Sequence, residues 1–127
     1  MKRLELATTV NTPHIILDAE KKIFLIEGKS YPEDSKQFFQ STLDWLNEYR
    51  KQKPVSFILN CNIFYLSSSS MISFKQILLI LVAYQANGTK VEILWNYDEE
   101  DDDIKKTGED YMKITNLKFT FKANPLS

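Results

Sequence analysis

The chain has 127 residues, of which 43% are hydrophobic and 13% aromatic, and its net charge is -1. This length fits one domain, which can bury roughly two-thirds of the surface of the unfolded chain. Sequence-independent nucleic-acid binding requires clustered basic residues, whereas the 16 Lys and Arg residues here are scattered. We therefore exclude a nucleic-acid-binding protein of that kind.

The cellular location is predicted from three features of the sequence. Cys61 is the only cysteine, so the chain has no internal disulfide, which is typical of a reducing compartment. The N-terminal residues lack the apolar core of a signal peptide. The longest apolar run, at 77–84, is too short to span a bilayer. We expect a cytoplasmic protein that does not enter the membrane.

The first third of the chain predicts a hairpin followed by a helix. Residues 14–17 and 22–27 resemble strands joined by a polar turn, with Gly28 closing the second. Apolar residues at three-to-four spacing predict a helix over 34–51. Two start signals compete there, because capping-box spacing begins both at residue 30 and at residue 34.

The remaining elements alternate between strands and helices. The strand from Val55 places Val55, Phe57, Leu59, Cys61 and Ile63 on one side. A helix over 70–87 ends at Gly88, and then come a strand at 89–95, a short helix through Tyr111 and a strand at 117–122. The order ββαβαβαβ predicts an α/β domain with a mixed sheet of about five strands and helices on one or both faces.

Four adjacent serines, at 67–70, stand between a predicted strand and an almost entirely apolar helix. Serine is among the best N-cap residues, so simple capping explains one of them. A phosphate is also stabilised at a helix N-terminus by the dipole and by the free N–H groups. The residues alone leave both interpretations open, a cap only or a cap that is also a phosphorylation site.

The segment 30–35 has the same position, after a strand and before a helix. A turn with a helix cap explains most of it, but a turn does not require the large aromatic Tyr31 beside Pro32. The carboxyl ends of parallel strands meet at one edge of a sheet. We therefore expect the two segments to form one surface, with Tyr31 and Tyr65 as exposed anchors.

Other candidate sites are weaker. The acidic run 98–103 has oxygen ligands for a divalent cation but lacks the glycine and spacing of a calcium loop, so a solvated loop that precedes a helix is the simpler interpretation. His14 and Cys61 form a nucleophile pair only if the fold brings them together, and Cys61 lies on the apolar side of its strand. The sequence contains no nucleotide-binding glycine motif or nucleophile elbow.

Four motifs occur in an order that identifies a resemblance. The first spans 31–35 (Tyr-Pro-Glu-Asp-Ser), the second 64–70 (Phe-Tyr-Leu and the four serines), the third 91–97 and the fourth 108–111. With these motifs the chain resembles the SiaC family of bacterial regulatory phosphoproteins over nearly its whole length.

The resemblance implies a STAS-like domain and a non-enzymatic role in partner switching, without a cofactor. In such a cycle a Ser/Thr kinase phosphorylates the protein and a PP2C-type phosphatase removes the phosphate. The unphosphorylated form binds and activates a diguanylate cyclase, which raises cyclic di-GMP and favours biofilm.

The family pattern at the switch is tyrosine, leucine, asparagine, threonine or serine, and then two serines. It assigns the phosphoacceptor to Ser68, with Ser69 as the second choice; Ser67 replaces the family's asparagine. The expected partner-binding residues are Tyr31, Pro32, Glu33, Tyr65, Leu66, Ser67, Ser69 and Ser70.

Two alternative functions remain beside the partner-switching regulator. One alternative is a constitutive adaptor whose serines only cap the helix. The other is a small metal-dependent enzyme that uses the acidic run 98–103. We expect a monomer, or a weak homodimer formed through an exposed sheet edge.

Overall fold

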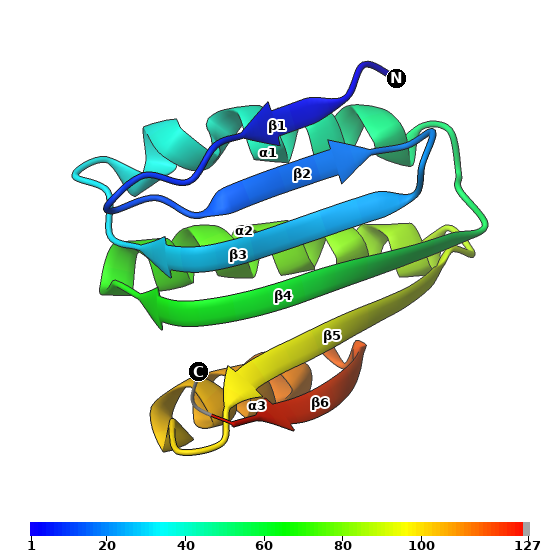
Figure 1. The fold of residues 1–127 in the computed structure, drawn as a ribbon. Coiled ribbons are helices and arrows are strands. Elements are labelled where there is room, and N and C mark those ends of the chain that lie inside the picture. The colour runs from blue at the N-terminus through cyan, green and yellow to red at the C-terminus, as the bar shows by residue number, and fades with distance from the viewer. Residues whose placement is uncertain (126–127) are drawn as a thin grey trace.

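The computed structural model describes residues 1–125, which form an α/β fold with one mixed sheet. The six strands lie in the sheet in their chain order. β1 and β2, and β2 and β3, are antiparallel, whereas β3 to β6 are parallel (Figure 1). The elements are β1 (Leu4–Leu6), β2 (His14–Asp18), β3 (Ile23–Ser30), α1 (Ser35–Arg50), β4 (Ser56–Leu66), α2 (Ser68–Ala86), β5 (Lys90–Asp98), α3 (Asp102–Thr115) and β6 (Lys118–Asn124).

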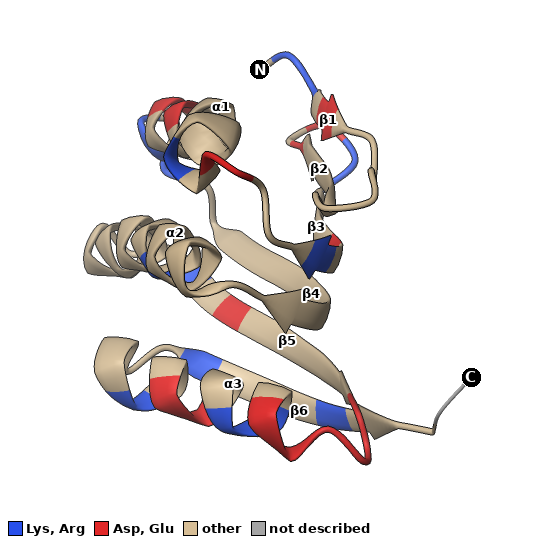
Figure 2. Cartoon of the chain, turned by 90° about the vertical axis from the view of Figure 1, so that its left-hand side faces the viewer, with Lys and Arg blue, Asp and Glu red and all other residues tan. Residues whose placement is uncertain are grey.

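The three helices of the described chain cover one face of the sheet (Figure 2). Each helix connects two parallel strands that are direct neighbours, and every crossover steps the same way along the sheet. Right-handed crossovers that all step in one direction put their helices on the same face. Of the two arrangements that the sequence allowed, helices on one face or on both, the structure has the first.

The core lies between this face and the helices. In β4 the alternation places Phe57, Leu59, Cys61 and Ile63 in the core, each no more than 1% exposed. Val55, which the same alternation assigned to that side, is 84% exposed, and this part of the prediction is wrong. The strand begins only at Ser56, so Val55 lies in the preceding turn.

α2 is a core helix. It is long and apolar enough to cross a bilayer if judged only by length and composition. In the fold, however, Phe74, Leu78, Leu81 and Tyr84 are fully buried, and the helix contacts α1, α3, β4 and β5. Its unusual hydrophobicity therefore reflects its central place among the helices.

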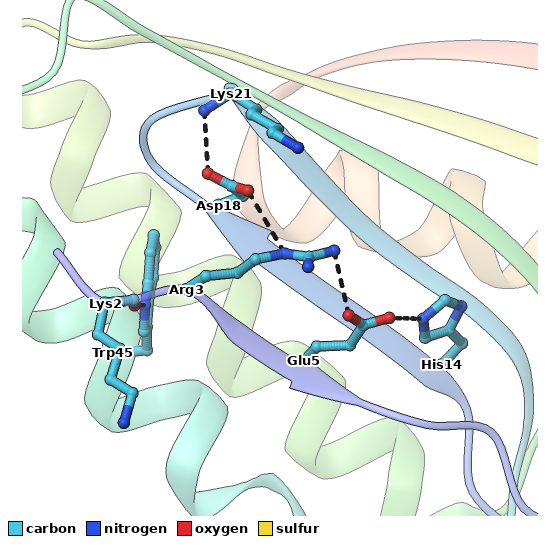
Figure 3. A network of polar contacts seen from close by, with 7 residues as sticks. All are labelled: Lys2, Arg3, Glu5, His14, Asp18, Lys21 and Trp45. Carbon is cyan, nitrogen blue, oxygen red and sulfur yellow. Dashed lines mark hydrogen bonds and ion pairs between the residues drawn. The ribbon is translucent and has the colours of Figure 1, made fainter.

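β1 is a strand that the sequence did not predict, and it makes the observed order βββαβαβαβ. It covers the edge of β2 with only three residues. Polar contacts hold it there (Figure 3): the Glu5 carboxylate lies 2.7 Å from Nε2 of His14, Arg3 pairs with Asp18, and the Trp45 indole N–H donates to the carbonyl of Lys2 at 2.7 Å. A strand this short depends on such contacts, which its own sequence does not reveal.

β3 also differs from the prediction. It does not close at Gly28 but continues to Ser30 after a register shift between Gly28 and Lys29. Gly28, opposite Ile63, has a φ of +124°, which residues with side chains rarely adopt, and the extra residue at the shift is Phe64 of β4. The extension carries Ser30 to the end of β4.

Candidate functional site

Three strand-to-helix junctions lie at one edge of the sheet. β3, β4 and β5 are parallel, so their carboxyl ends, Ser30, Leu66 and Asp98, point the same way (Figure 1). Each strand is followed within a few residues by a helix N-terminus. Helix N-termini favour negative charge, so this edge gathers the positive ends of three helix dipoles.

At the second junction, Ser67 is the N-cap of α2. Its side chain accepts a hydrogen bond from the backbone N–H of Ser70 at 3.2 Å. The helix therefore begins at Ser68, two residues before the predicted start. The reason is that the first serine of the run takes the cap, and the other three then form the first turn.

The four hydroxyls at this junction differ in their surroundings. Ser70 is fully buried and Ser67 is half-buried, whereas Ser68 and Ser69 are exposed. The hydroxyls of Ser67, Ser69 and Ser70 all have hydroxyl partners within hydrogen-bond distance. Within residues 1–125 the hydroxyl of Ser68 has no such partner, so it points to solvent from the first residue of the helix.

The first junction is bound directly to the second. Asp34 is the N-cap of α1 and accepts from the N–H of Gln37 at 3.1 Å, which decides between the two start signals. Ser30 instead faces α2: its hydroxyl lies 2.8 Å from that of Ser70, and its carbonyl accepts from the N–H of Ser67 at 2.9 Å. The two segments therefore form one surface.

An aromatic pair lies where β3 and β4 end, since Tyr31 follows Ser30 and Tyr65 precedes Ser68 by three residues. The rings of Tyr31 and Tyr65 meet edge to face, with centroids 6.0 Å apart, and the two residues are 42% and 50% exposed. Among the other predicted binding residues, Glu33 is exposed and Pro32 is half-buried. Leu66 at 7% and Ser70 at 0% exposure are buried and lie beneath the surface that they support.

The site also includes residues that the sequence analysis did not single out. Ser35, the first residue of α1, places its hydroxyl 3.0 Å from that of Ser69 across a separation of 34 residues, and no local pattern signals such a contact. Met71 and Ile72 are 38% and 64% exposed. They follow Ser68 at three- and four-residue spacing, which a helical-face pattern could have indicated.

The structure does not bring His14 and Cys61 together as a nucleophile pair. The strand register aligns Ile15, Ile26 and Cys61 in one row on the helix-covered face, so the neighbouring His14 lies on the opposite face. Complete burial raises the pKa of the Cys61 thiol far above its usual value. This cysteine is therefore a protonated core residue.

The acidic run forms the third junction. Asp101 is the N-cap of α3 and accepts from the N–H of Ile104 at 3.0 Å, while Asp98 accepts from the N–H of Glu100 in the preceding turn. Over residues 1–125, no three acidic, histidine or cysteine side chains converge as metal ligands would. Asp98 and Asp101 thus have a structural role at the start of α3.

Comparison with known proteins now decides the family. Residues 6–124 match the model of the SiaC family of regulatory phosphoproteins. The chain belongs to this family. A curated relative from Pseudomonas aeruginosa (strain UCBPP-PA14), "Uncharacterized protein PA14_02130", is 27% identical over 126 residues, which are 98% of each chain.

Solved structures show the same SiaC fold. The apo-SiaC crystal structure from P. aeruginosa superposes with a TM-score of 0.90 at 26% identity, over 97% of this chain and all of that one. SiaC in the crystal structure of the diguanylate cyclase SiaD "in complex with its activator SiaC", also from P. aeruginosa, has a TM-score of 0.89 at 25% identity, over 95% of this chain and 99% of that one. That relative thus binds and activates a diguanylate cyclase.

Proposed function

We propose that this protein is a phosphorylation-controlled partner-switching regulator. Its unphosphorylated form binds a signalling protein through the surface around Tyr31 and Tyr65, and phosphate on Ser68 ends that binding. One observation carries the proposal: Ser68 is the exposed serine of the run whose hydroxyl has no partner among the described residues, and it begins α2 at the sheet edge where Tyr31 and Tyr65 meet.

The electrostatics of the junction favour such a switch. A phosphate adds a charge of about -1.5 to -2. At the first residue of α2 that charge is stabilised by the helix dipole, by about 0.3–1 kcal/mol when exposed. In the unbound protein the phosphate stays hydrated, whereas a partner that covers Ser68 would have to desolvate it. Desolvation of a charge costs several kcal/mol, which is comparable with the ~5.5 kcal/mol that a near-complete switch requires.

A diguanylate cyclase is the partner that we propose. The basis is the relative SiaC, which is described as the activator of the cyclase SiaD. A Ser/Thr kinase and a PP2C-type phosphatase would complete the cycle, with cyclic di-GMP and biofilm formation as its output. The kinase needs ATP, so the cycle as proposed is cytoplasmic.

The phosphorylation site is tested first, by mass spectrometry. Wild type, Ser68→Ala and Ser69→Ala are incubated with the kinase and ATP, and their intact masses are measured. Wild type and Ser69→Ala should gain one phosphate, whereas Ser68→Ala should gain none because it lacks the accepting oxygen. A Ser68→Ala protein that still gains phosphate while Ser69→Ala does not would move the site to Ser69.

The switch itself is tested by binding. Phosphorylated and unphosphorylated wild type are separated, and the Kd of each for the cyclase is measured, with Ser41→Ala as an exposed-serine control. Phosphorylation should weaken binding by at least about 100-fold, which corresponds to ~2.7 kcal/mol. Equal affinities would support the alternative of a constitutive adaptor, in which the serines only cap α2.

A further inference from the structure

A buried hydroxyl cluster joins the N-termini of α1 and α2. Ser30 and Ser70 are fully buried, and Ser35 is only 4% exposed. Two hydroxyls from the start of α2, those of Ser67 and Ser69, extend the cluster to the surface. We call these five residues, Ser30, Ser35, Ser67, Ser69 and Ser70, the hydroxyl cluster.

Ser35 is the member of this cluster that α1 contributes. Its Oγ lies 3.0 Å from Oγ of Ser69 and 3.2 Å from Oγ of Ser70. Ser69 has a second, longer contact of 3.3 Å to Oγ of Ser67. A hydroxyl has one proton to donate and accepts through its lone pairs, so these contacts fix the direction in which the Ser69 oxygen points.

Exposure alone does not distinguish Ser68 from Ser69, because both are exposed. Their hydrogen bonding does distinguish them. Within the described part of the chain, the Ser68 oxygen has no side-chain partner, whereas the Ser69 oxygen is turned toward Ser35. Phosphoryl transfer depends mainly on alignment of the attacking oxygen with the γ-phosphorus, and a restrained oxygen does not align freely.

We propose that Ser35 is a specificity-determining residue, which restricts phosphorylation to Ser68 by holding the hydroxyl of Ser69. The inference rests on the proposed function and adds to it the residue that selects the acceptor. In the reaction the Ser68 oxygen bonds to the γ-phosphorus of ATP, and the bond from that phosphorus to the bridging oxygen breaks. ADP leaves, and the hydroxyl proton passes to a base of the kinase.

The experiment compares full-length wild type, Ser35→Ala and Ser35→Cys after incubation with the kinase and ATP. The phosphorylated peptide is fragmented, and the ratio of phosphate on Ser69 to that on Ser68 is measured. Both Ser35 variants should raise this ratio at least tenfold, because alanine removes the hydrogen bond and a thiol forms only a weak one. Ser41→Ala, an exposed serine change on the same helix, should leave the ratio unchanged.

A second set of variants avoids dependence on one ratio. Ser68→Ala should block phosphorylation, and Ser35→Ala in the same chain should restore it on Ser69. Phosphate confined to Ser68 in both folded Ser35 variants, or no restoration in the double variant, would overturn the inference while the proposed function stands. Absence of phosphate anywhere on α2 of wild type would overturn both.

Discussion

The start of α2 and the start of α3 share a capping hydrogen-bond pattern but differ in charge. Each helix follows a parallel strand, and in each the residue before the helix accepts a hydrogen bond from the N–H three residues later: Ser67 from Ser70, and Asp101 from Ile104. At α3 the cap is a carboxylate and the first turn adds Asp102 and Asp103. The first turn of α2 has no acidic residue (Figure 2).

The same capping hydrogen bond is thus made by a charged group at α3 and by a neutral group at α2. The positive end of α3 is compensated permanently by fixed carboxylates, so a further negative charge would be repelled there. The positive end of α2 is capped by a neutral hydroxyl, and no charged residue occurs from 55 to 74. The nearest carboxylates come from the first junction, where Glu33 and Asp34 line one pocket with Ser69.

The largest expected effect on stability comes from the packing of α3 against the sheet. A Cβ at Gly108 would lie 2.6 Å from Nε1 of Trp95, whose side chain is fully buried. Gly108→Val should therefore lower the free energy of unfolding by about 3 kcal/mol, because overpacking outweighs the small difference in helix propensity.

Urea denaturation measures this loss, with Lys105→Val as the control. Lys105 is exposed on the same helix, so valine there should change stability by no more than about 0.5 kcal/mol. Equal unfolding midpoints for the two variants would contradict the close packing of α3 against Trp95.

A smaller effect should separate two serines within the α2 junction. Ser70→Ala removes a buried hydroxyl that contacts those of Ser30, Ser35 and Ser67, so it should lower the free energy of unfolding by about 2 kcal/mol. Ser68→Ala removes an exposed hydroxyl and should cost less than about 0.5 kcal/mol. If thermal unfolding shows the same loss for both, the division into supporting and accessible hydroxyls is wrong.

The smallest effect comes from exchanging charge between the two helix starts. Ser68 and Asp102 are both the first residue of their helices. Ser68→Asp should raise the free energy of unfolding by about 0.5 kcal/mol, and Asp102→Ser should lower it by a similar amount, because each changes one charge at a helix N-terminus.

Chemical denaturation by urea at low salt and again at about 1 M sodium chloride provides the check on this exchange. Screening over a Debye length of about 3 Å should shrink both effects. Effects of the same sign, or effects that salt leaves unchanged, would show that packing and not the dipole determines them.

Much of this fold could be predicted from local sequence patterns, and the predictions that were wrong have physical causes. Alternation in β4 and the three-to-four spacing of α1 predicted their buried faces, since both patterns concern neighbours in the chain. β1 escaped prediction because a three-residue strand forms only where an edge and a partner for Glu5 already exist. The start of α2 was misplaced because a run of serines does not say which one caps.

The candidate site, like the fold, could be predicted only in part from the sequence. Its two segments were placed together correctly, since parallel strands end at one edge. The choice between exposed and supporting serines was not predictable, because it depends on Ser30 and Ser35, more than 30 positions away in the sequence. Such contacts are set by the register of β3 on β4, which the bulge after Gly28 shifts.

The strand order described above also bears on how the chain folds. Every strand pairs only with its immediate predecessor and successor in the chain, so no early strand must wait for a late one. Each βα unit leaving the ribosome, at about 5–20 residues per second, can therefore dock on an edge that already exists. The sheet can grow during synthesis from its amino-terminal hairpin outward, with β6 added last.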